Sequence, residues 1–254
     1  MNADNSSFSK FNWTLLSNVV HAFDNFVSIN QTRKTIEGLA IQPIDLPQLF
    51  SMFATFYVST ESFIGSSADF QILTVDEKCS LYQRNIHGVL HLCATFILRL
   101  SDLFDCSARE NLLIASYGYD IFQKTKRIAL QLDYDLTIIK LFLLILAFSS
   151  TCYIVDGHEN MQNDRFLYGT YRLFGSQNVY VEALWKYMIH RYNYYDAAYR
   201  FARLIKHMLD LLKLSEAATQ TNEIHQNFVD EISTITEQQL IIHQDEVTPL
   251  WGKT

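Results

Sequence analysis

The sequence is poor in the residues that interrupt helices. It has eight glycines and three prolines, and because these are Pro43, Pro47 and Pro249, positions 48–248 contain no proline at all. Proline removes a backbone donor and clashes with the preceding turn, and glycine weakens a helix, so long stretches without them are compatible with long helices. This scarcity favours an all-α fold.

Cysteine is also scarce, and no two cysteines form a CxxC pair. A structural zinc site draws two ligands from one turn of chain and therefore needs closely spaced pairs. The pattern predicts reduced thiols in an intracellular protein, with no cofactor and no metal. The four cysteines are Cys79, Cys93, Cys106 and Cys152.

Positive charge is in deficit, since the formal net charge is −7. An acidic chain repels phosphate backbones, so direct binding of nucleic acid is not expected.

Residues 1–10 lack the apolar centre of a leader peptide, and we expect them to be disordered ahead of one folded domain over 11–254. The uncharged stretch 141–155 is shorter than the roughly 20 residues of a membrane span, so we predict a buried central helix and no membrane partner.

Motifs of enzyme sites are missing. The sequence has no GxSxG, no phosphate-binding Walker loop and no GxGxxG, so we expect a protein that is not an enzyme. His87 and His91 share one face of a predicted helix but have no third ligand nearby in sequence, which favours ordinary packing. The carboxylates of 156–164 are typical of a polar loop.

Apolar residues recur at helical spacing through most of the chain. This periodicity predicts helices over 11–26, 49–65, 75–102, 118–131, 136–154, 177–193 and 196–228. Thr74 and Glu77 form a capping-box pattern at the start of the third helix, and the join 130–136, which holds Asp133 and Asp135, contains a carboxylate able to cap the fifth. We expect polar loops over 27–47 and 156–176 and a short hairpin within 103–117.

Three segments resemble the ligand-binding domain of nuclear receptors. The first, 63–84, has an aromatic residue (Phe63), a short spacer, Phe70 and Leu73. An acidic-polar pair (Glu77-Lys78) then leads into a Leu-rich helix that includes Leu81. The second, 130–148, is similar to the family's Leu-Asp turn before its central helix. The third, 179–214, has a helix ending in HRYNYYD that leads into RFARLIKHMLDLL, which resembles the start of the family's long dimerisation helix.

This resemblance implies a three-layer antiparallel helical sandwich of the ligand-binding-domain type. The implied function is regulation of transcription through a lipophilic ligand, through receptor and coregulator partners, or through both. The implied location is the nucleus, with the cytoplasm as the alternative. A second interpretation stays open: a ligand-independent helical protein that forms homodimers or heterodimers and titrates other receptors.

Two sets of site residues follow from this placement. A mostly apolar pocket for a lipophilic molecule is expected where the inner helices meet, unless aromatic side chains fill it. Its predicted lining residues are Phe56, Ser59, Thr60, Phe63, Cys93, Phe96 and Ile97. The resemblance also places Gln83 and Arg84 in a coregulator groove. Met208, Leu211 and Leu212 are predicted near a dimer contact, with intramolecular packing as the alternative.

The chain departs from the family at the coactivator clamp. Gly65 occupies the position of a family lysine, and the segment 248–251 resembles the start of the activation helix without the glutamate that follows it. The sequence also shows no zinc-finger motif, so we expect no direct sequence-specific contact with DNA. These departures resemble either an atypical receptor that acts through partners or a fragmentary gene product.

Overall fold

The structure, a computed structural model, describes residues 9–41, 46–105, 107–132, 135–149 and 170–221, and scattered positions from 223 to 238. Within these residues the regular elements are helices and there is no strand, which confirms the all-α prediction. Of the segment 1–10 that was expected to be disordered, residues 1–8 lie outside the described residues, whereas Ser9 caps α1 and Lys10 begins it, so the expectation is wrong there; the clamp segment at 248–251 also lies outside the described residues. The helices are α1 (Lys10–Phe26), α2 (Ile29–Ile41), α3 (Leu46–Gly65), α4 (Ala68–Gln71), α5 (Val75–Leu100), the 3₁₀ turn η1 (Leu103–Asp105), α6 (Ser107–Tyr117), α7 (Tyr119–Gln131), α8 (Leu136–Ala147), α9 (Thr170–Arg191) and α10 (Tyr194–Thr221).

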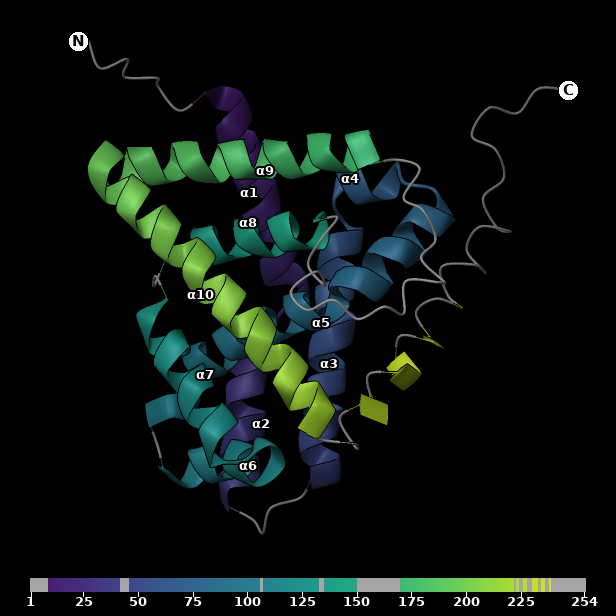
Figure 1. Cartoon of the computed structure of the whole chain (residues 1–254), viewed down its shortest axis with the longest axis vertical. Helices are drawn as coiled ribbons and strands as arrows, with labels where there is room; N and C mark the ends of the chain where they lie inside the picture. The colour runs from purple at the N-terminus through teal and green to yellow at the C-terminus, as the bar shows by residue number, and fades with distance from the viewer. Residues whose placement is uncertain are drawn as a thin grey trace, which may run out of the picture.

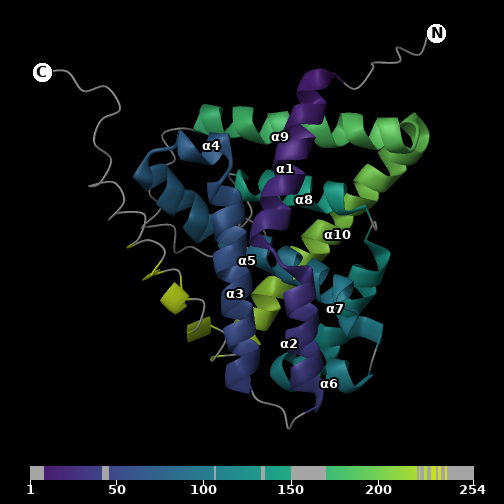
Figure 2. The same ribbon diagram turned by 180° about the vertical axis from the view of Figure 1, so that it is seen from behind.

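Helices α5 and α8 lie inside the molecule. Figure 1 shows α10 and α7 on the near face, and Figure 2, seen from behind, shows α1, α2 and α3 on the opposite face. Helix α5 contacts α2 and α3 on one side and α7 and α10 on the other. Helix α9 crosses one end of the molecule and packs on α8, α10 and α1. The segment 63–84, the first of the three resembling segments, therefore leads into a central helix.

Helix α8 is the most apolar element of the fold. Its residues from Ile138 to Ala147 are all buried, which confirms the predicted central helix up to 147. The helix ends there, so the prediction is wrong for Phe148 and Ser149, and its further continuation from 150 to 154 lies outside the described residues. The Asp135 carboxylate accepts a hydrogen bond of 3.0 Å from the Thr137 N–H and caps the start, as predicted. Buried Asn85 of α5 donates to the carbonyls of Ala147 and Ser149 at the other end. No described helix has the length and apolarity to cross a bilayer.

The capping box at the start of α5 forms as predicted. The Thr74 N–H donates to Glu77 Oε2 at 2.8 Å, and the Glu77 N–H donates to Thr74 Oγ1 at 3.3 Å. These two bonds satisfy backbone donors that the first helical turn leaves unpaired. They fix the point at which the chain leaves α4 and enters the interior.

Three predicted irregular regions are helical in the structure. The loop expected over 27–47 contains α2, which Ser28 caps and whose inward face is narrow, with Ile36 fully buried and Thr32 nearly so. The hairpin expected within 103–117 is wrong, because η1 and α6 occupy this stretch. The loop expected over 156–176 is wrong from 170 onward, since α9 begins there, and 156–169 lies outside the described residues. Burial of a few side chains outweighed the polar composition of these stretches.

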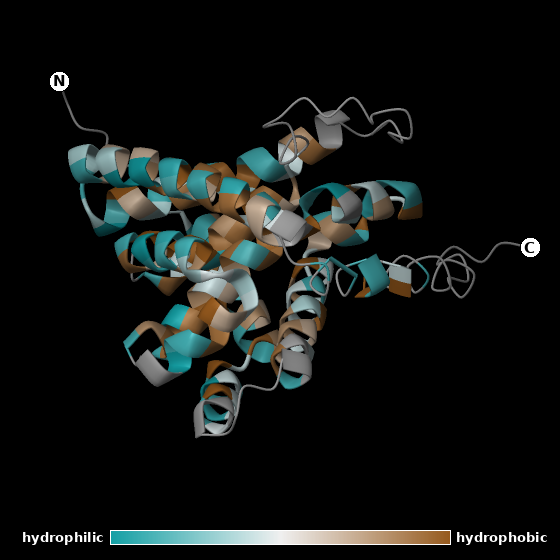
Figure 3. Ribbon diagram, turned by 60° about the horizontal axis from the view of Figure 1, so that its bottom comes forward, coloured by the Kyte–Doolittle hydropathy of each residue, from teal (hydrophilic) through white to brown (hydrophobic). Residues whose placement is uncertain are grey.

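Apolar residues face inward on the outer helices. Figure 3 shows brown, hydrophobic segments turned toward the centre and teal, hydrophilic segments on the outside. A single main cluster of buried side chains joins α1 to α10, and Phe23, Phe63, Phe96 and Phe148 are among its largest members. Buried aromatic rings of this size contribute much of the folding free energy.

Candidate ligand pocket

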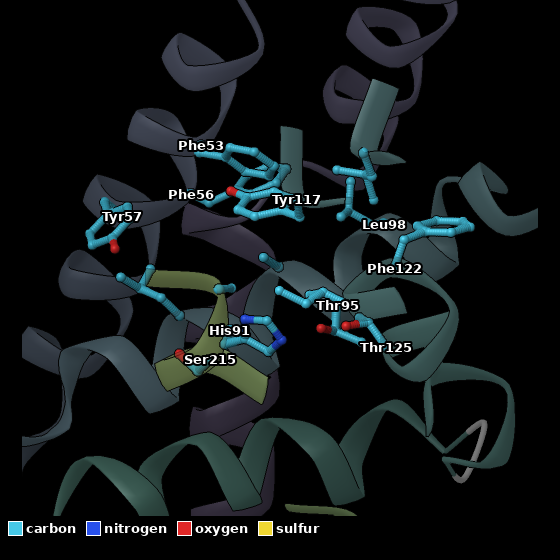
Figure 4. Close-up of a pocket in the computed structure, with 15 residues that line it drawn as sticks. Phe53, Phe56, Tyr57, His91, Thr95, Leu98, Tyr117, Phe122, Thr125 and Ser215 are labelled. Atoms are coloured by element: carbon cyan, nitrogen blue, oxygen red, sulfur yellow. The ribbon is translucent and has the colours of Figure 1, made fainter. Parts of the chain in front are cut away.

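An apolar pocket opens where five helices meet. Its walls come from α3, α5, α6, α7 and α10, which bring together residues far apart in the sequence (Figure 4). The described lining residues are Phe53, Phe56, Tyr57, Leu90, His91, Ala94, Thr95, Leu98, Leu113, Tyr117, Ile121, Phe122, Thr125, Ser215 and Ala218. This is the largely apolar lining with a few polar groups that is typical of sites for small lipophilic molecules.

The pocket has an aromatic end and a polar end. In Figure 4 the rings of Phe53, Phe56 and Tyr117 gather at one end. The Phe53 ring centroid lies 5.9 Å from that of Phe56 and 6.2 Å from that of Tyr117, which are the separations of interacting aromatic pairs. The other end carries the polar side chains, a histidine and three hydroxyls: His91, Thr95, Thr125 and Ser215.

No carboxylate, ammonium or guanidinium group is among the described lining residues. Burial raises the pKa of Tyr117 far above its ordinary value, so its hydroxyl is neutral at physiological pH. A charged ligand would lose its hydration here without gaining an opposite charge. The lining therefore favours a neutral molecule that offers one or two hydrogen-bonding groups.

The cavity is small, about 70 Å³. Drug-sized ligands occupy pockets of roughly 300–1,000 Å³, so this conformation has room only for a compact molecule. A larger ligand would need the aromatic end to open.

The predicted lining residues are divided between the wall and the core. Phe56 lies on the pocket wall. Thr60 and Cys93 are buried beside it and bonded to each other, with the Thr60 hydroxyl donating to Sγ at 3.2 Å. Burial raises the pKa of Cys93 to about 12, which keeps the thiol neutral and unreactive. Phe63 packs edge-to-face on Phe23 of α1, with ring centroids 5.3 Å apart.

The remaining predicted side chains also lie away from the described wall. Phe96 and Ile97 are fully buried in the main core, and Ser59 is half-buried on α3. The sequence reasoning missed the contributions of α6, α7 and α10, above all Tyr117 and Thr125. Only long-range packing brings those helices to α3 and α5.

The predicted partner-binding residues lie in different surroundings. Met208 and Leu211 are each 2% exposed and belong to the main core, so their side chains are covered within the chain itself. Leu212 is half-buried and lies close to Gly88 of α5. Arg84 is half-buried on α5, and the side chain of Gln83 lies outside the described residues. Intramolecular packing, the alternative weighed for the α10 residues, holds for Met208 and Leu211.

Among the described residues, no three His, Cys, Asp or Glu side chains cluster in a way that could hold a metal ion. A comparison with models of known protein families found no match to this chain, and a comparison with curated proteins found no similar sequence.

Proposed function

We propose that this chain is a domain of the nuclear-receptor ligand-binding type that binds a compact, neutral, lipophilic molecule and regulates transcription in the nucleus through protein partners. The observation that carries the proposal is the uncharged pocket at the junction of α3, α5, α6, α7 and α10. Its apolar walls would stabilise a lipophilic molecule, and its polar end would orient one hydroxyl or carbonyl group.

The helix arrangement also supports the proposal. The three resembling segments fall on the turn from α3 through α4 into α5, on α8, and on α9 with α10. Helices α5 and α8 lie between α1–α3 and α7 with α10, an order that fits a three-layer sandwich. The capping box of Thr74 and Glu77 begins the central helix at the position that the resemblance implies.

Thermal unfolding in the presence of compact, neutral, lipophilic compounds such as single-ring aromatic alcohols tests ligand binding. A ligand of the folded state stabilises it by mass action, by about 2.7 kcal/mol at a hundredfold excess over Kd. The Ala94→Leu variant, which fills the pocket from α5, should lose this stabilisation. A panel that stabilises both proteins equally, or neither, would contradict the ligand proposal.

A reporter-gene assay tests the regulatory part of the proposal. The chain is fused to an unrelated DNA-binding domain, and a compound that stabilises the purified protein is added to the cells. We expect reporter expression to change with the compound in the wild-type fusion and to stay constant in the Ala94→Leu fusion. Unchanged expression in both fusions, with both proteins present in the nucleus, would refute transcriptional regulation by this ligand.

A second candidate function is ligand-independent dimerisation. Tyr195, Tyr199 and Leu209 lie along one stripe of α10 and are 85%, 69% and 48% exposed. Exposed apolar residues gathered on one helix mark contact surfaces, and a second copy of the chain can meet such a stripe with its own.

Sedimentation at increasing protein concentration tests this candidate. Tyr199→Glu should shift the chain toward the monomer, because it places a charge within the contact. Tyr119→Glu is the matched control, since Tyr119 is 67% exposed on α7. A wild-type monomer at every concentration, or equal effects of both substitutions, would rule out this homodimer.

A further inference from the structure

A second cavity, separate from the apolar pocket, lies where the end of α7 meets α9 and α10. Its volume is about 220 Å³, larger than that of the apolar pocket. One part of its wall is apolar, formed by Leu130, Leu132, Ile138, Met188 and Leu204, and the rest carries Gln131, Arg200, Arg203 and His207. No carboxylate is among the described residues of this wall.

The cationic side chains of the wall are held in place. Arg203 Nε donates to His207 Nε2 at 3.2 Å, and Arg203 Nη2 donates to the Gln131 carbonyl at 3.0 Å. The Arg200 guanidinium lies over the Tyr192 ring, 4.2 Å from its centroid. Arginines fixed in this way lose little side-chain entropy when they bind an anion.

His207 contributes a buried polar group to the same wall. Its residue is only 7% exposed, and Nδ1 has no hydrogen-bond partner among the described residues. A guanidinium can only donate, so His207 Nε2 accepts from Arg203 and the neutral ring carries its proton on Nδ1. Burial, with the neighbouring charges of Arg203 and Lys206, lowers the pKa of His207, whereas Asp210 acts in the opposite direction. The Nδ1 proton is therefore a buried donor that no described acceptor satisfies.

We propose that this cavity binds a small amphipathic organic acid. Its carboxylate is held by Arg203 and Arg200, and its short apolar group lies on Leu132, Ile138 and Met188. The fixed guanidiniums supply the charge-assisted donors that carboxylates prefer. A volume below the roughly 300–1,000 Å³ of drug-sized sites limits the ligand to a short-chain or single-ring acid.

Calorimetric titration with hexanoate tests the proposal, with hexanol as the neutral analogue and inorganic phosphate as an anion without an apolar part. We expect hexanoate to bind more tightly than either.

Arg203→Gln should weaken hexanoate binding at least about tenfold, because a hydrogen bond to a charged group contributes on that order. Arg203→Lys should retain part of the affinity, since it keeps the charge and loses the planar fork. Arg127→Gln, on the exposed face of α7, is the matched control and should bind like wild type.

Circular dichroism shows whether each variant is folded. If Arg203→Gln unfolds, Arg200→Gln takes its place: both side chains are exposed, but Arg203 also bonds to His207 and to the Gln131 carbonyl. Three results would overturn the proposal: equal affinities for hexanoate and hexanol, a preference for phosphate, or equal weakening by Arg127→Gln. Absence of hexanoate binding to the folded wild-type chain at millimolar concentration would overturn it as well.

Discussion

Ala94→Leu should stabilise the folded chain, because residue 94 lines the apolar pocket and the added atoms enter empty space. Burying three more carbons contributes up to about 2.4 kcal/mol at roughly 0.8 kcal/mol each, and leucine has nearly the helix propensity of alanine. Cavity volume gives a similar figure, since filling 70 Å³ at about 24 cal/mol per Å³ yields about 1.7 kcal/mol. We therefore expect a gain of about 2 kcal/mol in the free energy of unfolding, measured by urea denaturation.

The control for this prediction is Ala183→Leu on α9. Ala183 is also helical and is 1% exposed, but it belongs to the closed main core and does not line the pocket. The same added volume there forces neighbouring side chains apart and should destabilise by about 1–3 kcal/mol. Equal destabilisation by the two substitutions would refute the pocket and, with it, the proposed ligand site.

Two further predictions concern the buried ionisable side chains Lys140 and His207. Asp24 is bonded at 2.5 Å to Lys140, whose side chain is 3% exposed, whereas that of Asp24 is 55% exposed. Asp24→Ala should therefore destabilise by about 1–3 kcal/mol in urea denaturation, and adding Lys140→Met should restore most of the loss; no rescue would contradict this account. The second prediction concerns pH. Burial and the charge of Arg203 lower the pKa of His207 in the folded state below the value of about 6.5 that it has in the unfolded state. As the pH falls below about 6.5 the unfolded state therefore binds more protons than the folded state, and the free energy of unfolding declines until the pH has passed the folded-state pKa. His207→Gln should flatten the fall in Tm between pH 7.5 and 5.5, whereas exposed His21→Gln should not; equal slopes would contradict the assignment.

The sequence predicts the elements whose signals are local. The capping box of Thr74 and Glu77 can be recognised in the sequence because its two residues are three positions apart. The cap by Asp135 can be recognised because an unbroken apolar helix follows it. Helix α2 was missed because its buried stripe is narrow. Ile36 and Thr32 are buried because α3, α5 and α6 pack on α2, and no pattern in the sequence of α2 itself indicates that packing.

Of the apolar pocket, the sequence predicts only a wall residue whose position follows from the periodicity of a single helix. Phe56 belongs to the inward stripe of α3, which periodicity identifies. Tyr117, Thr125 and Ser215 lie on helices whose positions depend on packing across the whole chain. In the second cavity, the four-residue spacing of Arg203 and His207 is visible in the sequence. The acceptor that holds Arg203 is a carbonyl 72 residues away, which no local pattern could indicate.

Helix α10 contributes to both cavities, and its geometry keeps their tests separate. His207 lies on the wall of the second cavity and Ser215 on that of the first, eight positions further along the helix. At 1.5 Å per residue these positions are about 12 Å apart along the axis. The two cavities also share no described lining residue, so a substitution on the wall of one leaves the wall of the other unchanged. A failure of Ala94→Leu to block a lipophilic ligand would therefore count against the apolar pocket alone, and a failure of Arg203→Gln to weaken hexanoate would count against the acid site alone.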